Sequence, residues 1–181
     1  MVQAWLISRR KVRLHRVLGR FSLLLAPIVV VSGLRVVQIM VLRNLEGFRL
    51  YRIKFVFLDL TALVLFSAFL GLAIWSARKR DIGNHKRYMA CTTLLALEPA
   101  LERLLMTLLP ALITNFDKAL YAALLSMDVI VAGLIVVEGW TGRIRAPFPF
   151  LLAYYVAVHI LATPVASNPW FQTFAMWFAR L

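Results

Sequence analysis

The chain has few of the residues from which soluble active sites are usually built. Only eight of its 181 residues are acidic, and Cys91 is its single cysteine. One cysteine excludes an internal disulfide and any cysteine-rich metal or cluster site. The sequence contains no G-x-S-x-G, Walker loop, H-E-x-x-H or dinucleotide fingerprint. It also has no Gly/Ser/Pro-rich linker, low-complexity stretch or internal repeat. These absences favour a single, non-catalytic domain covering residues 1–181.

Long apolar runs make up most of the chain. Hydrophobic residues are 62% of the sequence and the mean hydropathy is +0.80, well above a soluble domain. Each run has about the ~20 residues that a helix needs to cross ~30 Å of hydrocarbon. The sequence therefore predicts an all-α, polytopic transmembrane bundle of about five spans, multi-pass in an inner (cytoplasmic) membrane. The expected spans are residues 21–42, 55–77, 88–112, 119–137 and 146–166.

The net charge of +13 is concentrated between these runs. The segments before the first run, between the second and third, and between the fourth and fifth carry thirteen Lys and Arg residues. The connections on the other side and the C-terminus carry six. The positive-inside rule then places the N-terminus in the cytoplasm. This distribution indicates a lipid bilayer as the partner of the basic residues and argues against nucleic acid.

Both ends of the chain have the pattern of amphipathic helices in the membrane interface. Asn168 is suited to cap a helix and Pro169 to its first turn. The aromatic side chains that follow form one face of a short helix at about residues 169–180, for contact with lipid or a neighbouring protein. They are Trp170, Phe171, Phe174, Trp177 and Phe178. At the N-terminus, apolar residues alternate with a basic cluster that suits anionic lipid.

Seven ionisable residues fall inside the expected spans at similar depths. We expect them to form a buried polar cluster of Arg35, Asp59, Glu98, Glu102, Arg103, Asp128 and His159. Glu98 and Glu102 share a helix face because they are four residues apart. Pro99 between them predicts a kink. With His159 neutral and the others ionised, the cluster has a net charge of minus two, which favours a protonated acid or a bound cation.

Two interpretations of this cluster remain open. In the structural one, Arg35 pairs with Asp59 and Arg103 pairs with Asp128, and the polar contacts hold the helices together. In the functional one, the carboxyl groups form a proton relay, a metal site or an anchor for a quinone headgroup. Carboxylates and one imidazole would suit a hard divalent metal, but no spacing selects that metal.

Two further histidines lie at the predicted cytoplasmic face. His15 precedes the first apolar run, and His85 precedes the third. Two histidines on different helices are the minimum for bis-imidazole ligation of haem b. Their basic neighbours could bind haem propionates, but such residues more often meet lipid phosphates, so a single haem b is the less favoured alternative.

Two short elements carry a resemblance to other proteins. His15-Arg16-Val17-Leu18-Gly19 leads into the first run, and His85-Lys86-Arg87-Tyr88-Met89 opens the third. The chain resembles a group of small predicted bacterial membrane proteins that share a domain of unknown function, with H-x-x-L-G and H-K-R-x-M elements in similar positions. The resemblance covers roughly residues 11–145 and extends to a Gly-Arg turn at Gly142, although some relatives have histidine in place of Arg145. The group has no settled activity, so the resemblance implies a fold and not a function.

Three functions are compatible with this sequence. The first is a non-catalytic accessory or scaffold subunit of a larger membrane complex of respiratory or photosynthetic type, because the chain has almost no soluble part to house its own chemistry. The second is an electron-transfer module that binds one haem b at His15 and His85, or a quinone. The third is a metal or proton carrier that uses the intramembrane carboxyl groups. The first of these also requires a protein partner.

Overall fold

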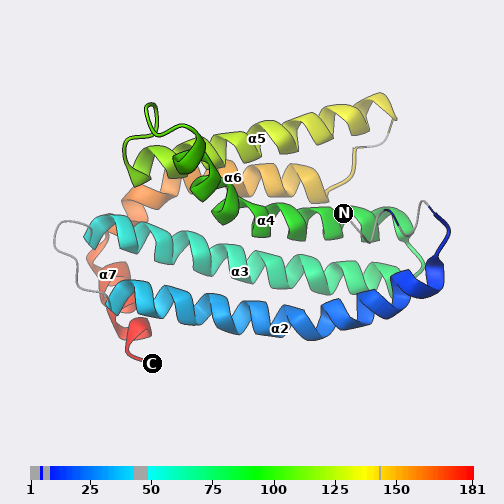
Figure 1. Ribbon diagram of the computed structural model, residues 1–181, viewed down its shortest axis with the longest axis horizontal. Coiled ribbons are helices and arrows are strands. Elements are labelled where there is room, and N and C mark those ends of the chain that lie inside the picture. The colour runs from blue at the N-terminus through cyan, green and yellow to red at the C-terminus, as the bar shows by residue number, and fades with distance from the viewer. Residues whose placement is uncertain (1–4, 6–8, 43–48, 143) are drawn as a thin grey trace.

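The protein is an all-α bundle, as the sequence predicts. The computed structural model describes residue 5 and residues 9–42, 49–142 and 144–181 (Figure 1). Within these ranges no strand occurs. The helices are α2 (Val12–Leu42), α3 (Arg49–Arg78), α4 (Ile82–Leu108), α5 (Phe116–Trp140), α6 (Pro147–Ser167) and α7 (Pro169–Ala179).

Side-chain caps fix where three of these helices begin. Asp81 accepts a hydrogen bond from the Asn84 backbone N–H at the start of α4, and Asn115 accepts one from Lys118 N–H at the start of α5. Asn168 accepts from Trp170 N–H at 2.9 Å, with Pro169 as the first residue of α7. These bonds satisfy donors that a helix N-terminus leaves without partners. The capping role predicted for Asn168 is confirmed.

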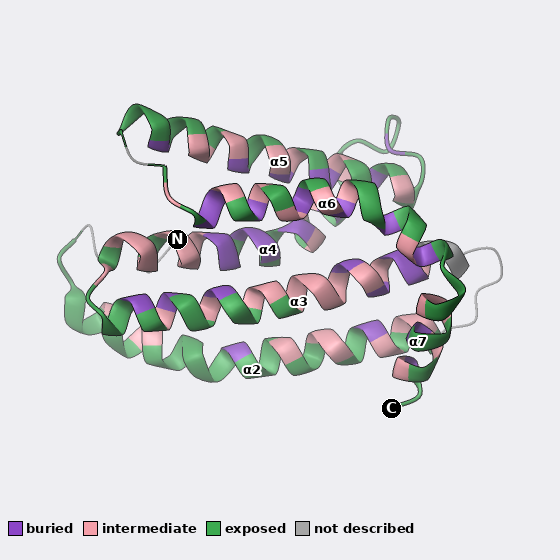
Figure 2. Cartoon of the chain, turned by 180° about the vertical axis from the view of Figure 1, so that it is seen from behind, coloured by how far each residue is buried: buried purple, intermediate pink, exposed green. Residues whose placement is uncertain are grey.

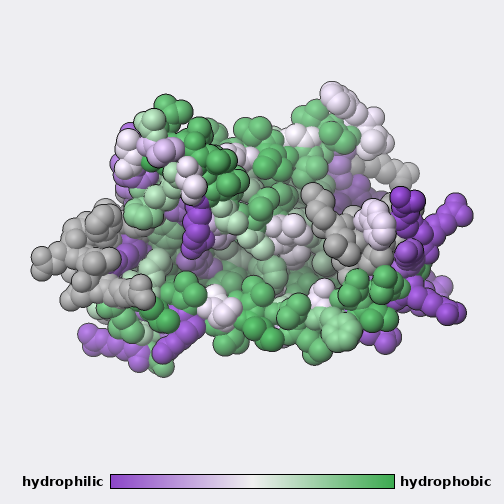
Figure 3. All heavy atoms as spheres, viewed as in Figure 1, coloured by the Kyte–Doolittle hydropathy of each residue, from purple (hydrophilic) through white to green (hydrophobic). Residues whose placement is uncertain are grey.

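Helix α3 is the central helix of the bundle. It packs against α2, α4, α6 and α7, while α5 packs against α4 and α6 (Figure 1). The main core lies where α3, α4, α5 and α6 meet, and its fully buried members include Cys91, Met127 and Leu151. Successive long helices run in opposite directions. The start of α2, the α3–α4 connection and the α5–α6 connection therefore share one end of the bundle, and that end holds the three basic segments (Figures 1 and 3).

Four helices are long and apolar enough to cross a membrane. They are α2, α3 from Arg52, α5 and α6. Their outer faces are apolar as well, with Val64 71% exposed and Val129 66% exposed. Figures 2 and 3 show exposed, hydrophobic helix surfaces between hydrophilic ends. A surface of this kind suits hydrocarbon and not water, so the chain has the architecture of a multi-pass membrane protein.

Helix α4 differs from the other long helices. Its 27 residues would extend about 40 Å, but Glu98, Glu102 and Arg103 make its second half too polar to group it with those four. A fifth span and the cytoplasmic N-terminus therefore remain predictions. Pro99 lies in this second half, and in Figure 1 the last turns of α4 turn away from the line of its first turns. Proline produces such a bend because it removes a backbone hydrogen bond and crowds the preceding turn.

The helix predicted at residues 169–180 is present as α7, and its aromatic rings contact one another along one face, which is only partly exposed. Phe171 and Phe178 pack against a second core cluster that contains Val37 and Val56. The carbonyl of Phe178 also accepts a hydrogen bond from Gln38 Nε2 at 3.2 Å. Trp170 and Trp177 are 85% and 57% exposed. The aromatic pattern thus serves both to dock α7 onto α2 and α3 and to form an exposed surface.

The helix boundaries differ from the expected spans at several points. Helix α2 begins at Val12, nine residues before the expected start of the first span, so the basic residues from Arg13 to Arg20 form its first turns. No separate interfacial helix occupies residues 12–20. The earlier part of that predicted helix falls mainly outside the described residues. Helix α4 also begins earlier, at Ile82, because Asp81 caps it.

Candidate functional site

Four of the seven predicted cluster residues line one cavity. Asp59 comes from α3, and Glu98, Glu102 and Arg103 come from α4. The cavity has a volume of about 490 Å³ and lies over α3, between α2 and α4. The remaining lining is mostly apolar and comes chiefly from the same three helices: Val29, Ser32, Gly33, Val36, Met40, Phe55, Ala62, Leu63, Phe66, Leu95, Ala96, Pro99, Met106 and Phe116.

Helix periodicity brings the acidic side chains to this cavity. Glu98 and Glu102 are one turn apart and therefore face the same side of α4. Asp59 lies ten residues after the start of α3, and Glu98 lies ten residues before the end of α4. Because the two helices are antiparallel, both residues lie about 15 Å from the same end of the bundle. The side chains line the same cavity well inside the apolar part of the protein.

Burial makes the charge of this cavity significant. Glu98 and Glu102 are only 7% and 6% exposed. Arg103 is exposed at the cavity edge, where its Nη1 donates to the carbonyl oxygen of Pro99 at 2.8 Å. Glu98 forms no hydrogen bond with any other residue that the structure describes. Three carboxylates and one guanidinium would give the lining a net charge of minus two, which is costly in a medium of low dielectric constant.

Asp128 and His159 form a separate polar contact between α5 and α6. His159 Nε2 lies 2.8 Å from Asp128 Oδ2, and the imidazole stacks on the Tyr121 ring with centroids 6.0 Å apart. The other carboxylate oxygen of Asp128 is buried and has no partner among the described residues. Asp128 pairs with His159, and Arg103 bonds to the Pro99 carbonyl, so the predicted Arg103–Asp128 pair is absent.

Arg35 also has a different partner from the one expected. Its Nη1 donates to Gln38 Oε1 at 3.0 Å, one turn along the same helix. Asp59 faces the cavity instead, so the predicted Arg35–Asp59 pair is absent. The hydrogen-bond partner of Arg35 is thus the Gln38 amide on the exposed side of its own helix, α2, and not the Asp59 carboxylate of α3.

The two histidines of the resemblance lie at the basic end of the bundle. His85 Nδ1 lies 2.9 Å from the carbonyl oxygen of Ala73 on α3. A carbonyl only accepts, so Nδ1 carries the proton and donates it. The Nδ1 of His15 is buried and has no partner in the part of the chain that the structure describes. Ligation of haem b by His15 and His85 remains a prediction. Across the described residues, no three His, Cys, Asp or Glu side chains are grouped to hold a metal ion.

The sequence did not single out Glu138, which joins three parts of this basic end. Glu138 is 8% exposed, and its Oε1 accepts a hydrogen bond from Arg87 Nε. Its Oε2 also accepts from the backbone N–H of Arg145 at 3.2 Å. The arginine of the H-K-R-x-M element is thus tied through Glu138 to the Gly-Arg turn before α6. Glu138 directly follows the fourth expected span, at the end of the bundle where two arginine-rich segments are expected. This position in the sequence could have identified it as a partner for arginine.

Asp81 extends the same network at the N-terminus of α4. Its pKa is lowered, first by the hydrogen bond from Asn84 N–H and further by the guanidinium of Arg145. Arg145 Nη1 lies 3.5 Å from Asp81 Oδ1 and 3.3 Å from Asn84 Oδ1. Gly83 makes room for this guanidinium, because a Cβ there would lie 2.9 Å from Arg145 Nη1. Arg87 of the H-K-R-x-M element and Arg145 after the Gly-Arg turn therefore have a structural role, because they connect helix ends.

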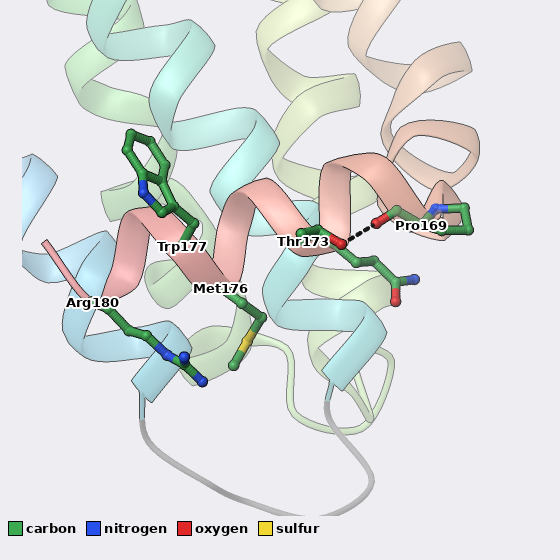
Figure 4. A pocket seen from close by; sticks show the side chains of 6 residues that line it. Pro169, Thr173, Met176, Trp177 and Arg180 are labelled. Carbon is green, nitrogen blue, oxygen red and sulfur yellow. Dashed lines mark hydrogen bonds between the residues drawn. The ribbon is translucent and has the colours of Figure 1, made fainter.

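A second hollow, of about 440 Å³, lies along α7 (Figure 4). Its lining comes from that one helix: Pro169, Gln172, Thr173, Met176, Trp177 and Arg180. It contains no carboxylate, and Thr173 Oγ1 donates to the Pro169 carbonyl within the helix at 3.0 Å. A groove along a single helix offers no convergent polar groups, so the cavity between α2, α3 and α4 is the stronger candidate site.

Comparison of the chain with protein-family models, curated proteins and solved structures found no match. The functional assignment therefore depends on the chemistry of the site.

Proposed function

We propose that this protein is an integral membrane protein that takes up and releases protons through the carboxyl groups of Asp59, Glu98 and Glu102. One observation carries the proposal: three acidic side chains from two helices line a single cavity between α2, α3 and α4, well away from the helix ends. Ionisable residues within membrane helices commonly face such cavities and mark proton or ion pathways.

The charge balance of the cavity supports proton binding. Each uncompensated charge near the centre of a membrane helix costs about 2.5–3.5 kcal/mol on insertion scales. Asp59 and Glu98 alone carry two negative charges against the one positive charge of Arg103, which leaves one to be neutralised. A proton can neutralise it without close convergence of the acids, whereas a metal ion requires several ligand atoms at 2.0–2.6 Å. No such metal-binding group occurs among the described residues.

The experiment is infrared spectroscopy of the purified protein at neutral pH, in buffer without organic cations. We expect a carbonyl-stretch band from protonated carboxylic acids. In Glu98→Gln this band should fall, because the Asp59 carboxylate that remains is balanced by Arg103. Asp128→Asn is the matched control, since it removes a membrane acid outside the cavity and should leave the Glu98-dependent band in place. A wild-type spectrum without the band would rule out protonated carboxyl groups in this cavity.

The accessory-subunit hypothesis is a second candidate, supported by a different surface. Trp170 and Trp177 project from α7 and remain largely exposed after that helix has docked. Tryptophan is enriched both in protein interfaces and at the membrane surface. Native electrophoresis of gently solubilised membranes distinguishes the two roles. A complex that is lost in a Trp170→Ala/Trp177→Ala variant supports a protein partner, whereas migration as a lone chain counts against it.

A further inference from the structure

We propose that the cavity between α2, α3 and α4 binds a lipophilic organic monocation in exchange for protons, a ligand class that rests on the proposed proton-binding function. Such a ligand carries one positive charge within an apolar or aromatic framework, as quaternary ammonium and phosphonium ions do. Each feature of that chemistry has a counterpart in the lining of the cavity.

The carboxyl groups supply the charge complementarity. Glu98 is nine-tenths buried, lines the cavity and forms no hydrogen bond with another described residue. Asp59 and Glu102 line the same space. Asp59 and Glu98 carry one negative charge more than Arg103 balances. A neutral ligand such as a quinone would leave that charge in place, whereas a monocation neutralises it. The cavity therefore favours a positively charged ligand over a neutral one.

The walls favour an organic cation over an inorganic one. Phe55, Phe66 and Phe116 line the cavity together with aliphatic side chains of α2. Aromatic rings attract cations through their negative faces, and apolar walls favour the organic groups around the charge. A volume of about 490 Å³ lies within the range of small-molecule sites, roughly 300–1,000 Å³. A metal ion would need a close group of ligands, and no such group occurs in the described parts of the chain.

The arrangement of the helices gives a lipid-soluble cation a route to the site. Helices α2 and α4 both pack on α3 but make little direct contact with each other, and the cavity lies between them. Gly33 lies on the α2 wall, where an added Cβ would approach Leu63 Cδ2 to 3.0 Å. Small residues at Gly33, Ala62 and Ala96 keep this space open. A cation dissolved in the bilayer could therefore enter sideways.

Exchange with protons makes binding depend on pH. The ionisable groups of the lining are Asp59 from α3 and Glu98, Glu102 and Arg103 from α4; α2 and α5 contribute none in the described residues. From α6, Tyr154 and Tyr155 lie close enough to Glu98 to interact with it electrostatically. A monocation that binds to a protonated site must displace a proton or share the cavity with the neutral acid. We therefore expect affinity to rise with pH, by up to about tenfold per pH unit for each proton released.

The test is tetraphenylphosphonium binding to the purified full-length protein in detergent, by equilibrium dialysis at several pH values. Tetraphenylborate, an anion of nearly the same shape, controls for partition into micelles. We expect saturable phosphonium binding that strengthens as pH rises, with no saturable borate binding. Glu98→Gln should weaken binding at least tenfold, while Glu98→Asp, which keeps the charge, should retain most of it.

A pair of alanine substitutions on α4 tests the location of the site. Ala96 lines the cavity, whereas Ala100, one turn further along, is exposed and outside it. Ala96→Phe should reduce phosphonium affinity and Ala100→Phe should leave it unchanged, with similar melting temperatures in both variants. Equal binding by wild type and Glu98→Gln, or equal binding of phosphonium and borate, would overturn the proposal. If the infrared band of protonated carboxyl groups persists without phosphonium binding, only the ligand class fails. Phosphonium binding without that band would contradict proton exchange instead.

Discussion

Replacing Arg87 by methionine should lower the free energy of unfolding by about 3 kcal/mol, one of the largest effects expected in this protein. Arg87 and Glu138 form an ion pair whose side chains are 21% and 10% exposed. Methionine preserves most of the side-chain volume but leaves the Glu138 carboxylate nearly buried without its guanidinium. Only the N–H of Arg145, at 3.2 Å, remains as a donor to that carboxylate. Unfolding by SDS in mixed micelles measures the change.

Two further variants test whether the pair itself is responsible. Lys86→Met is the matched control, because Lys86 is the exposed neighbour of Arg87 and its replacement should change stability by at most about 0.5 kcal/mol. Arg87→Met combined with Glu138→Leu should recover part of the loss, because no buried charge remains. If the stability losses of the two single variants simply add in the double variant, the two side chains do not interact as the structure indicates.

Replacing His159 by leucine should destabilise the α5–α6 interface by about 2–3 kcal/mol. His159 Nε2 lies 2.8 Å from Asp128 Oδ2, and the other oxygen of that carboxylate already has no partner among the described residues. Without the imidazole, Asp128 would have no hydrogen-bonding partner in an apolar interface. The Asp128 and His159 side chains are partly exposed, but they lie on helices that face hydrocarbon. Water therefore does not screen the charge of this pair.

A double-mutant cycle tests this pair. Asp128→Leu should also be destabilising, because it leaves the imidazole without its acceptor. The Asp128→Leu/His159→Leu variant should be more stable than either single variant, since both polar groups are gone. Ile160→Leu, at a neighbouring exposed position, should have an effect within about 0.5 kcal/mol. Single-variant losses that simply add in the double variant would contradict a direct interaction.

Several features of the candidate site were accessible from sequence. The i, i+4 spacing of Glu98 and Glu102 placed both on one face of a helix, and their interruption of an apolar run marked them as unusual. Counting residues from the helix ends placed Asp59 at a comparable depth, and the structure brings it to the same cavity. Pro99 marked the part of α4 that turns away from its first turns. These inferences used only the regular rise and periodicity of a helix.

The choice of partners could not be read from sequence. Arg35 bonds to Gln38, Asp128 to His159, and Arg87 to Glu138, whereas the sequence suggested other pairs for Arg35 and Asp128. Each choice depends on how a helix is rotated about its axis. A sequence apolar on nearly every side gives little indication of that rotation, because hydrocarbon and protein core accept the same residues.

By itself, the sequence determined the all-helical class, the approximate apolar helices, and the concentration of basic residues in three segments that share one end of the bundle. Local composition and helical rise are sufficient for these features. Only the tertiary structure decided that α7 folds two of its aromatic residues inward, that the intramembrane charges divide between a cavity and a separate Asp128–His159 contact, and that Glu138 joins the helix ends. These features arise from the packing of side chains distant in sequence, which fixes helix rotation and crossing and which hydropathy does not encode.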